Sequence, residues 1–186
     1  MRVTTKELFT IPNILSYLRL ILIPVFIYFY ITATDVSDYY IAALIILLSG
    51  LTDMFDGLIA RRFNQVTDLG KVVDPIADKL TQMAIIICLV FHYPHIWILI
   101  VLFVIKELFM GINGLVLLKK GKKLDGAMWF GKVSTAVFYA ATFLLIAIPE
   151  INPSTAAILM VTTGVFLGLS FILYIPEFLK LYRHAS

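Results

Sequence analysis

Four aspartates between positions 53 and 78 fall into two pairs with helical spacing. Asp53 and Asp56 are three residues apart, and Asp74 and Asp78 are four apart. In helices, residues at these spacings lie on one face, so each pair would project together. Four carboxylates that face one another in a medium of low dielectric constant repel strongly, and bound cations remove that repulsion. The spacing therefore predicts a cation site.

The ligand types indicate which cation. Carboxylate oxygens alone suit a hard ion such as Mg²⁺ or Mn²⁺, and neither a cysteine nor a histidine lies near the acids to favour zinc. Four carboxylates from two helices suffice for two ions about 4 Å apart, an arrangement that catalyses in-line phosphoryl transfer. We expect two Mg²⁺ or Mn²⁺ ions per site.

The elements that must position these acids are membrane helices. The chain of 186 residues is 61% hydrophobic and only 15% charged, whereas soluble domains are about 45–50% apolar and about 25% charged. This composition excludes an ordinary water-soluble protein and a disordered one. A membrane span needs roughly 20 apolar residues, and such stretches occur at about 11–32, 39–60, 74–93, 95–118, 128–149 and 155–179.

We therefore predict an all-α integral membrane protein with six transmembrane helices in a single domain, residues 1–186. Counted from the predicted outer ends of their spans, Asp53 lies about 21 Å and Asp78 about 24 Å into the bilayer core. Two helices thus bring the acids to nearly the same depth, in the cytoplasmic third of a core roughly 30 Å thick.

The basic residues predict the orientation. Lysines and arginines precede the first span, separate spans two from three and four from five, and follow the sixth span, while the other three connections carry none. The positive-inside rule then places both termini in the cytoplasm. The acidic site would open to the cytoplasmic side of the cytoplasmic membrane, among lipid headgroups that attract the basic loops.

The N-terminal segment has two possible structures. Residues 1–10 form either a short amphipathic helix in the membrane interface or a flexible tail. The apolar run that follows is too long for a signal peptide and carries Arg19 midway, so we expect it to be retained.

Small and basic residues accompany the acids. Gly57, Ala60 and Gly70 remove bulk beside them, which would admit a phosphorylated ligand or would simply permit tight helix packing. Arg61 offers a fork of donors for a phosphate, with anchoring at the cytoplasmic face as the alternative. The spacing leaves these alternatives open.

Taken together, these positions resemble the signature of the CDP-alcohol phosphotransferases at every fixed position: Asp53-x2-Asp56-Gly57-x2-Ala60-Arg61-x8-Gly70-x3-Asp74-x3-Asp78. The resemblance extends to the length and the topology of the whole chain. It implies a homodimeric, six-helix membrane enzyme that moves a substituted phosphate from a CDP-linked lipid to an alcohol and releases CMP.

The resemblance also implies roles for individual residues. The four aspartates would bind two divalent metals, and Asp78 would be the catalytic base for the attacking hydroxyl. A first-helix pattern, Pro12-Asn13-Ile14-Leu15-Ser16-x2-Arg19, resembles the one that approaches the donor headgroup, although Asn13 could instead cap the helix. The residues expected to bind the CDP donor are Gly57, Ala60, Arg61, Thr67, Gly70, Asn13 and Ser16.

The acceptor alcohol is less well determined. The apolar frame favours CDP-diacylglycerol as the donor, and Lys132, Lys106 and Arg19 are the candidates for an acceptor phosphate. Lys106 has an alternative state, paired with the neighbouring Glu107. The segment 130–135 and the Lys106-Glu107 pair resemble phosphatidylglycerophosphate synthases, which use glycerol-3-phosphate.

A second acceptor remains open because Gly114 stands where those enzymes have arginine. The opening Thr10–Ser16 also resembles cardiolipin synthases, which use phosphatidylglycerol. We place glycerol-3-phosphate first and phosphatidylglycerol second.

Functions of other classes fit less well. An ion or proton transporter would carry polar residues through the depth of several helices, whereas here the acids gather at one level. A purely structural protein would bear the cost of buried acids without a use for them. Membrane lipids are expected partners, and nucleic acid is not.

Overall fold

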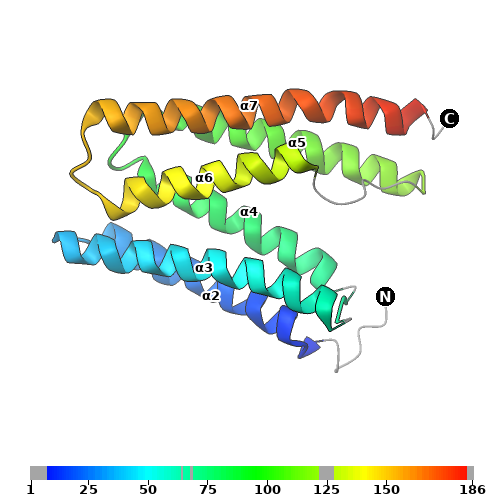
Figure 1. Cartoon of the computed structure of the whole chain (residues 1–186), viewed down its shortest axis with the longest axis horizontal. Coiled ribbons are helices and arrows are strands. Elements are labelled where there is room, and N and C mark those ends of the chain that lie inside the picture. The colour runs from blue at the N-terminus through cyan, green and yellow to red at the C-terminus, as the bar shows by residue number, and fades with distance from the viewer. Residues whose placement is uncertain (1–7, 64, 68, 122–127, 184–186) are drawn as a thin grey trace. The chain divides into compact units, whose positions relative to one another are not determined.

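The computed structural model describes residues 8–63, 65–67, 69–121 and 128–183. In this part of the chain, six long helices follow one another (Figure 1): α2 (Ile11–Ile31), α3 (Val36–Arg62), α4 (Gly70–Leu89), α5 (Trp97–Lys119), α6 (Trp129–Ala147) and α7 (Pro153–Arg183). A short 3₁₀ helix, η1 (Pro94–Ile96), precedes α5. No strand occurs among these residues, which confirms the all-α class. The predicted interfacial helix at residues 1–10 falls almost wholly outside the described ranges.

Local sequence explains several helix ends. The side chain of Asp38 accepts hydrogen bonds from the backbone nitrogens of Thr34 (2.9 Å) and Asp35 (3.2 Å), and so caps the start of α3. Pro153 opens α7, where a missing N–H costs nothing. Gly121 follows α5 with a φ of 70°, a left-handed conformation that glycine adopts readily.

Five of the helices are long and apolar enough to cross a membrane, namely α2, α3, α5, α6 and α7. The chain is therefore an integral membrane protein. The helix α4 falls short because its first ten residues include Lys71, Asp74, Asp78 and Lys79. The structure thus confirms the helices but not six spans.

Contacts divide the chain into two compact units. The first comprises the residues up to Phe91 together with Phe143–Glu150, and the second comprises His92–Thr142 together with Ile151 onward. The helix α6 contributes to both. The prediction of a single domain stays a prediction.

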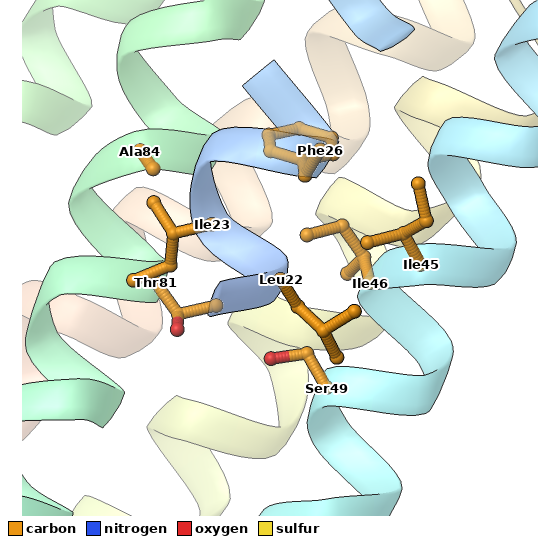
Figure 2. Close-up of a pocket in the computed structure, with 8 residues that line it drawn as sticks. All are labelled: Leu22, Ile23, Phe26, Ile45, Ile46, Ser49, Thr81 and Ala84. Atoms are coloured by element: carbon orange, nitrogen blue, oxygen red, sulfur yellow. The ribbon is translucent and has the colours of Figure 1, made fainter. Parts of the chain in front are cut away.

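In the first unit, α2 packs against both α3 and α4. Figure 2 shows a narrow pocket where side chains of these three helices meet: Leu22, Ile23, Phe26, Ile45, Ile46, Ser49, Thr81 and Ala84. Most of them are apolar and lie in the middle of their helices, where they form a hydrophobic core. Most charged residues of the three helices gather where α3 finishes and α4 begins, whereas Asp38 lies in the first turn of α3.

In the second unit, α5 packs against α7. Its core is largely aromatic: Tyr174 and Phe178 are buried together with Leu117, and the ring centroids of Phe130 and Tyr174 lie 4.7 Å apart in an edge-to-face arrangement. This unit is stabilised by apolar packing.

Candidate active site

One side of α2 is polar and completely buried. Asn13, Ser16 and Arg19 follow one another at intervals of three residues, with exposed fractions of 1%, 0% and 0%. Residues at this spacing lie close together along one side of a helix. Buried polar groups are tolerated only when other polar groups contact them, and each of these three reaches across to another segment of the chain.

Arg19 binds two aspartates of α3, Asp53 and Asp56. Its Nη1 lies 2.6 Å from Asp53 Oδ1, and its Nη2 donates a hydrogen bond to Asp56 Oδ2. The side chain of Asp53 is 43% exposed, whereas that of Asp56 is only 4% exposed. A single guanidinium therefore joins one accessible and one buried carboxylate.

Ser16 and Asn13 tie α2 to the start of α4. Ser16 Oγ donates a hydrogen bond to Asp74 Oδ1. Asn13 Oδ1 accepts one from Thr67 Oγ1 (3.1 Å), and Thr67 Oγ1 in turn accepts the backbone N–H of Gly70 (2.9 Å). Asn13 thus lies inside α2, whose N-cap residue is Thr10, so its alternative role as a helix cap is wrong.

The two glycines of the motif have different surroundings. A Cβ atom added at Gly70 would lie 2.8 Å from Asn13 Oδ1 and 3.0 Å from Thr67 Oγ1, whereas one added at Gly57 would meet nothing within 4 Å. The close approach of α2 and α4 therefore explains Gly70. Within the described part of the first unit, packing does not explain Gly57, whose side faces open space.

Asp78 has two neighbours that the sequence analysis missed. Gln82 Nε2 donates to Asp78 Oδ1 at 3.3 Å, and Lys79 Nζ lies 3.1 Å from Asp78 Oδ2. The side chain of Asp78 is 18% exposed. The spacing of four residues between Asp78 and Gln82, which puts them on one helix face, was a signal for this contact.

The acids influence one another electrostatically across the helices. Asp53 interacts with Asp74 and Asp78, and Asp56 interacts with Asp53 and Asp74. Arg19 and Lys79 form ion pairs with three of the four carboxylates.

This donor set fits divalent metal ions in ligand type, because all its ligands are carboxylate oxygens. Among the described residues, no group of three or more His, Cys, Asp or Glu side chains is arranged to hold a metal ion. Each acid contacts an internal partner instead, namely a cation, a hydroxyl or an amide.

The remaining predicted site residues lie on α3, α5 and α6. Ala60 lies on α3 one turn beyond Asp56, and the side chain of Arg61 lies outside the described part. In the second unit, Lys106 is buried and its Nζ lies 2.9 Å from Glu107 Oε1, which confirms the pairing expected as its alternative state. Lys132 is exposed on α6. The roles in substrate binding stay predictions.

A set of apolar helices that gathers carboxylates, a buried arginine and an open glycine at one end defines a membrane protein with an acidic site suited to phosphoryl chemistry. The family model of CDP-alcohol phosphatidyltransferases matches residues 9–170. The chain belongs to this family of transferases, which generally uses divalent metal ions.

Individual relatives agree with the family match. The chain is 34% identical, over 147 residues, to the CDP-diacylglycerol–glycerol-3-phosphate 3-phosphatidyltransferase of Escherichia coli (strain K12). The alignment covers 77% of this chain and 80% of the relative. The protein of the same name from Shigella flexneri serotype 5b matches with the same identity and coverage.

Proposed function

We propose that this enzyme transfers the phosphatidyl group of CDP-diacylglycerol to glycerol-3-phosphate, which gives phosphatidylglycerophosphate and CMP. The observation that carries the proposal is the convergence of Asp53, Asp56 and Asp74 on α2 at the end of the unit where Gly57 faces open space. The name of the E. coli relative supports the choice of donor and acceptor.

In the proposed reaction, the acceptor hydroxyl oxygen attacks the phosphorus that carries the diacylglycerol. A new P–O bond forms, the bond to the phosphate of CMP breaks, and CMP leaves with that electron pair. Asp78 takes the proton of the attacking hydroxyl. Its contacts with Gln82 and Lys79 hold the carboxylate in one orientation, and position matters more than basicity for a carboxylate in such a site.

Asp53, Asp56, Asp74 and Asp78 would hold the divalent ions. When bound, Mg²⁺ or Mn²⁺ would polarise the phosphoryl oxygens and neutralise the leaving phosphate. Gly57 leaves room beside Asp56 for the donor nucleotide. Farther along the same helices, mostly apolar side chains, Leu22 and Ile46 among them, line a pocket (Figure 2). In the proposed mechanism this apolar region would exclude water from the acids.

The proposed arrangement in the membrane includes α4 as a sixth span, with both termini and the acidic site on the cytoplasmic side. Five apolar helices and the positions of the basic loops support it. Glycerol-3-phosphate is charged and water-soluble, so a site open to the cytoplasm meets its substrate directly. A homodimer is proposed on the family resemblance.

The test is an acceptor panel with purified protein in detergent. Radiolabelled CDP-diacylglycerol is incubated with glycerol-3-phosphate, phosphatidylglycerol, inositol phosphate or serine, with Mg²⁺, Mn²⁺ or EDTA, and CMP and the lipid products are separated by chromatography. We expect phosphatidylglycerophosphate with glycerol-3-phosphate, and none in EDTA. Cardiolipin as the main product would reverse the choice of acceptor. Ion flux in vesicles without any release of CMP would contradict the enzyme assignment.

A further inference from the structure

Arg19 occupies an unusual place for a cation. Its side chain is fully buried on the apolar helix α2, and it contacts Asp53 and Asp56 of α3. Among the residues that the structure describes, Nε of Arg19 has no hydrogen-bond acceptor, and the close contact of Nη1 with Asp53 lacks the geometry of a hydrogen bond. The guanidinium is therefore held mainly by charge, between two carboxylates that are expected to bind metal.

We infer that Arg19 is the resident counter-cation of the metal site: its guanidinium positions Asp53 and Asp56, and its charge lowers their affinity for a divalent ion. The inference rests on the proposed function only in taking these aspartates as metal ligands. Arg19 is thus a positioning residue rather than a ligand of the acceptor phosphate.

The contacts argue against the phosphate role. Both terminal nitrogens of Arg19 face aspartates, and no part of the side chain is exposed. A phosphate brought to this guanidinium would lie beside Asp53 and Asp56, which carry the same sign of charge. Removal of one partner from a buried ion pair leaves the other charge uncompensated, so the arginine is needed for the fold as well.

The charge of Arg19 should weaken the binding of a divalent ion, not strengthen it. An arginine stays charged at every accessible pH, so it repels a divalent cation that binds the same carboxylates. Charges a few ångströms apart in a partly buried site repel strongly, and in the proposed balance this repulsion outweighs the gain from holding two side chains in place. Loss of the charge should therefore tighten metal binding, even though it disorders the carboxylates and slows the reaction.

The test compares Arg19→Gln, Arg19→Lys and wild type, with Arg62→Gln as the matched control. Arg62 is exposed at the end of α3, so its substitution removes the same charge outside the ion pair. Binding of Mn²⁺ to purified protein without lipid substrate is followed by the electron paramagnetic resonance signal of the free ion. Thermal unfolding is measured in EDTA and in saturating Mn²⁺.

We expect Arg19→Gln to bind Mn²⁺ about tenfold more tightly than wild type. It should unfold at a lower temperature in EDTA, and Mn²⁺ should close most of that gap. Arg19→Lys keeps the charge and should keep the affinity of wild type. Arg62→Gln should match wild type in both measurements.

Other results would overturn the inference. Unchanged or weaker Mn²⁺ binding by Arg19→Gln would remove the counter-cation role, and a raised KM for glycerol-3-phosphate with unchanged Mn²⁺ affinity would make Arg19 a phosphate ligand. If Arg19→Gln does not fold, Arg19→Gln/Asp56→Asn serves instead, because loss of both charges should restore folding in EDTA. Failure of that rescue contradicts the pairing. A wild type that binds no Mn²⁺ would overturn the proposed metal site itself, which is a separate outcome.

Discussion

Both units bury hydroxyls that bond within their own helix, as Thr81 does with the Ala77 carbonyl oxygen in the first unit, but they differ in the polar contacts that cross between helices. In the first unit, polar side chains bond across helices and over long stretches of sequence, as Ser16 does with Asp74 and Arg19 with Asp56. In the second unit, Thr142 and Thr163 donate to carbonyl oxygens four residues earlier in their own helices, each at 2.8 Å. Bonds of the first kind fix helices relative to one another, whereas bonds of the second kind only satisfy a hydroxyl.

This difference distinguishes the unit whose polar contacts can orient side chains for catalysis from the unit that is stabilised mainly by apolar packing. Hydrogen bonds between distant segments hold side chains in one orientation, and catalysis depends on such orientation. A hydroxyl bonded within its own helix turn leaves packing to apolar neighbours. The second unit has an interhelical bond as well, from Tyr182 Oη to Asn113 Oδ1 at 2.9 Å, but it joins two uncharged side chains beside an aromatic core. Substitutions should therefore affect activity first in one unit and stability first in the other.

The largest effect is expected from Asp56→Asn. It keeps the shape of a buried residue but removes one charge from the metal ligands, and it leaves Arg19 with a single carboxylate. We expect CMP release at saturating Mg²⁺ to fall by about a thousandfold or more, while the protein still inserts and folds. Thr142→Val is the control from the second unit and should keep activity within about twofold. Near-normal turnover by Asp56→Asn would remove the metal assignment.

The sequence predicted the acidic site better than its surroundings. The spacings of Asp53 with Asp56 and of Asp74 with Asp78 indicated which carboxylates share a helix face, because that depends only on helical geometry. Ion pairing of Arg19 with the aspartates was not predicted, because it depends on how α2 packs against α3 and α4. From the sequence, Arg19 is a candidate to bind the acceptor phosphate, whereas in the structure its guanidinium has two protein partners.

The fold, like the site, could be predicted from the sequence only in part. Hydropathy located all the long helices to within a few residues, because apolar runs of span length have few other structures. The helix α4 was expected at 74–93 and is found at Gly70–Leu89. Its early start depends on Thr67, whose hydroxyl accepts the Gly70 N–H, and on its contact with Asn13. Such a contact between distant segments leaves no trace in a hydropathy pattern.

Substitutions of Gly57 and Gly70 should have the next largest effects. The first tests access of the donor to the site, and the second tests the packing of the helices that form it. Gly57→Leu would place a side chain in open space where the donor should approach. We expect kcat/KM for CDP-diacylglycerol to fall roughly tenfold to a hundredfold, mainly through KM, with an unchanged unfolding temperature. Gly70→Ala is the matched variant; it should lower the unfolding temperature, because its Cβ would press on Asn13 and Thr67. Unchanged donor affinity in Gly57→Leu would restore the packing explanation.

Gly131→Ala tests the second unit, where stability should respond and donor and acceptor KM values should not. An added Cβ would lie 2.3 Å from the hydroxyl oxygen of Tyr174, which is buried. We expect a loss of about 1–3 kcal/mol in the free energy of unfolding, the usual cost of overpacking. Tyr174→Phe in the same chain should recover part of that loss, because it removes the atom in closest contact.

Gly114→Ala serves as the control for this prediction, since nothing lies within 4 Å of its added Cβ. Equal stability of Gly131→Ala and Gly114→Ala would show that Tyr174 moves aside without cost. The second unit would then be less tightly packed than its aromatic core indicates.

The smallest effect is expected from Lys132→Ala, which tests whether the second unit takes any part in binding the acceptor. Lys132 is exposed on α6, so water and salt weaken its attraction for a phosphate dianion. A hydrogen bond to a charged group is worth roughly 1.5–3 kcal/mol when well formed, and exposure should reduce this to about 1 kcal/mol, or roughly a fivefold rise in the KM for glycerol-3-phosphate. The KM for CDP-diacylglycerol should stay the same, and added salt should shrink the difference between variant and wild type.

Lys180→Ala is the control, because Lys180 is an exposed lysine that pairs with Glu177 at 2.9 Å. If Lys180→Ala raises the same KM equally, the effect comes from general positive charge near the membrane surface, and binding of the acceptor phosphate belongs to the first unit alone.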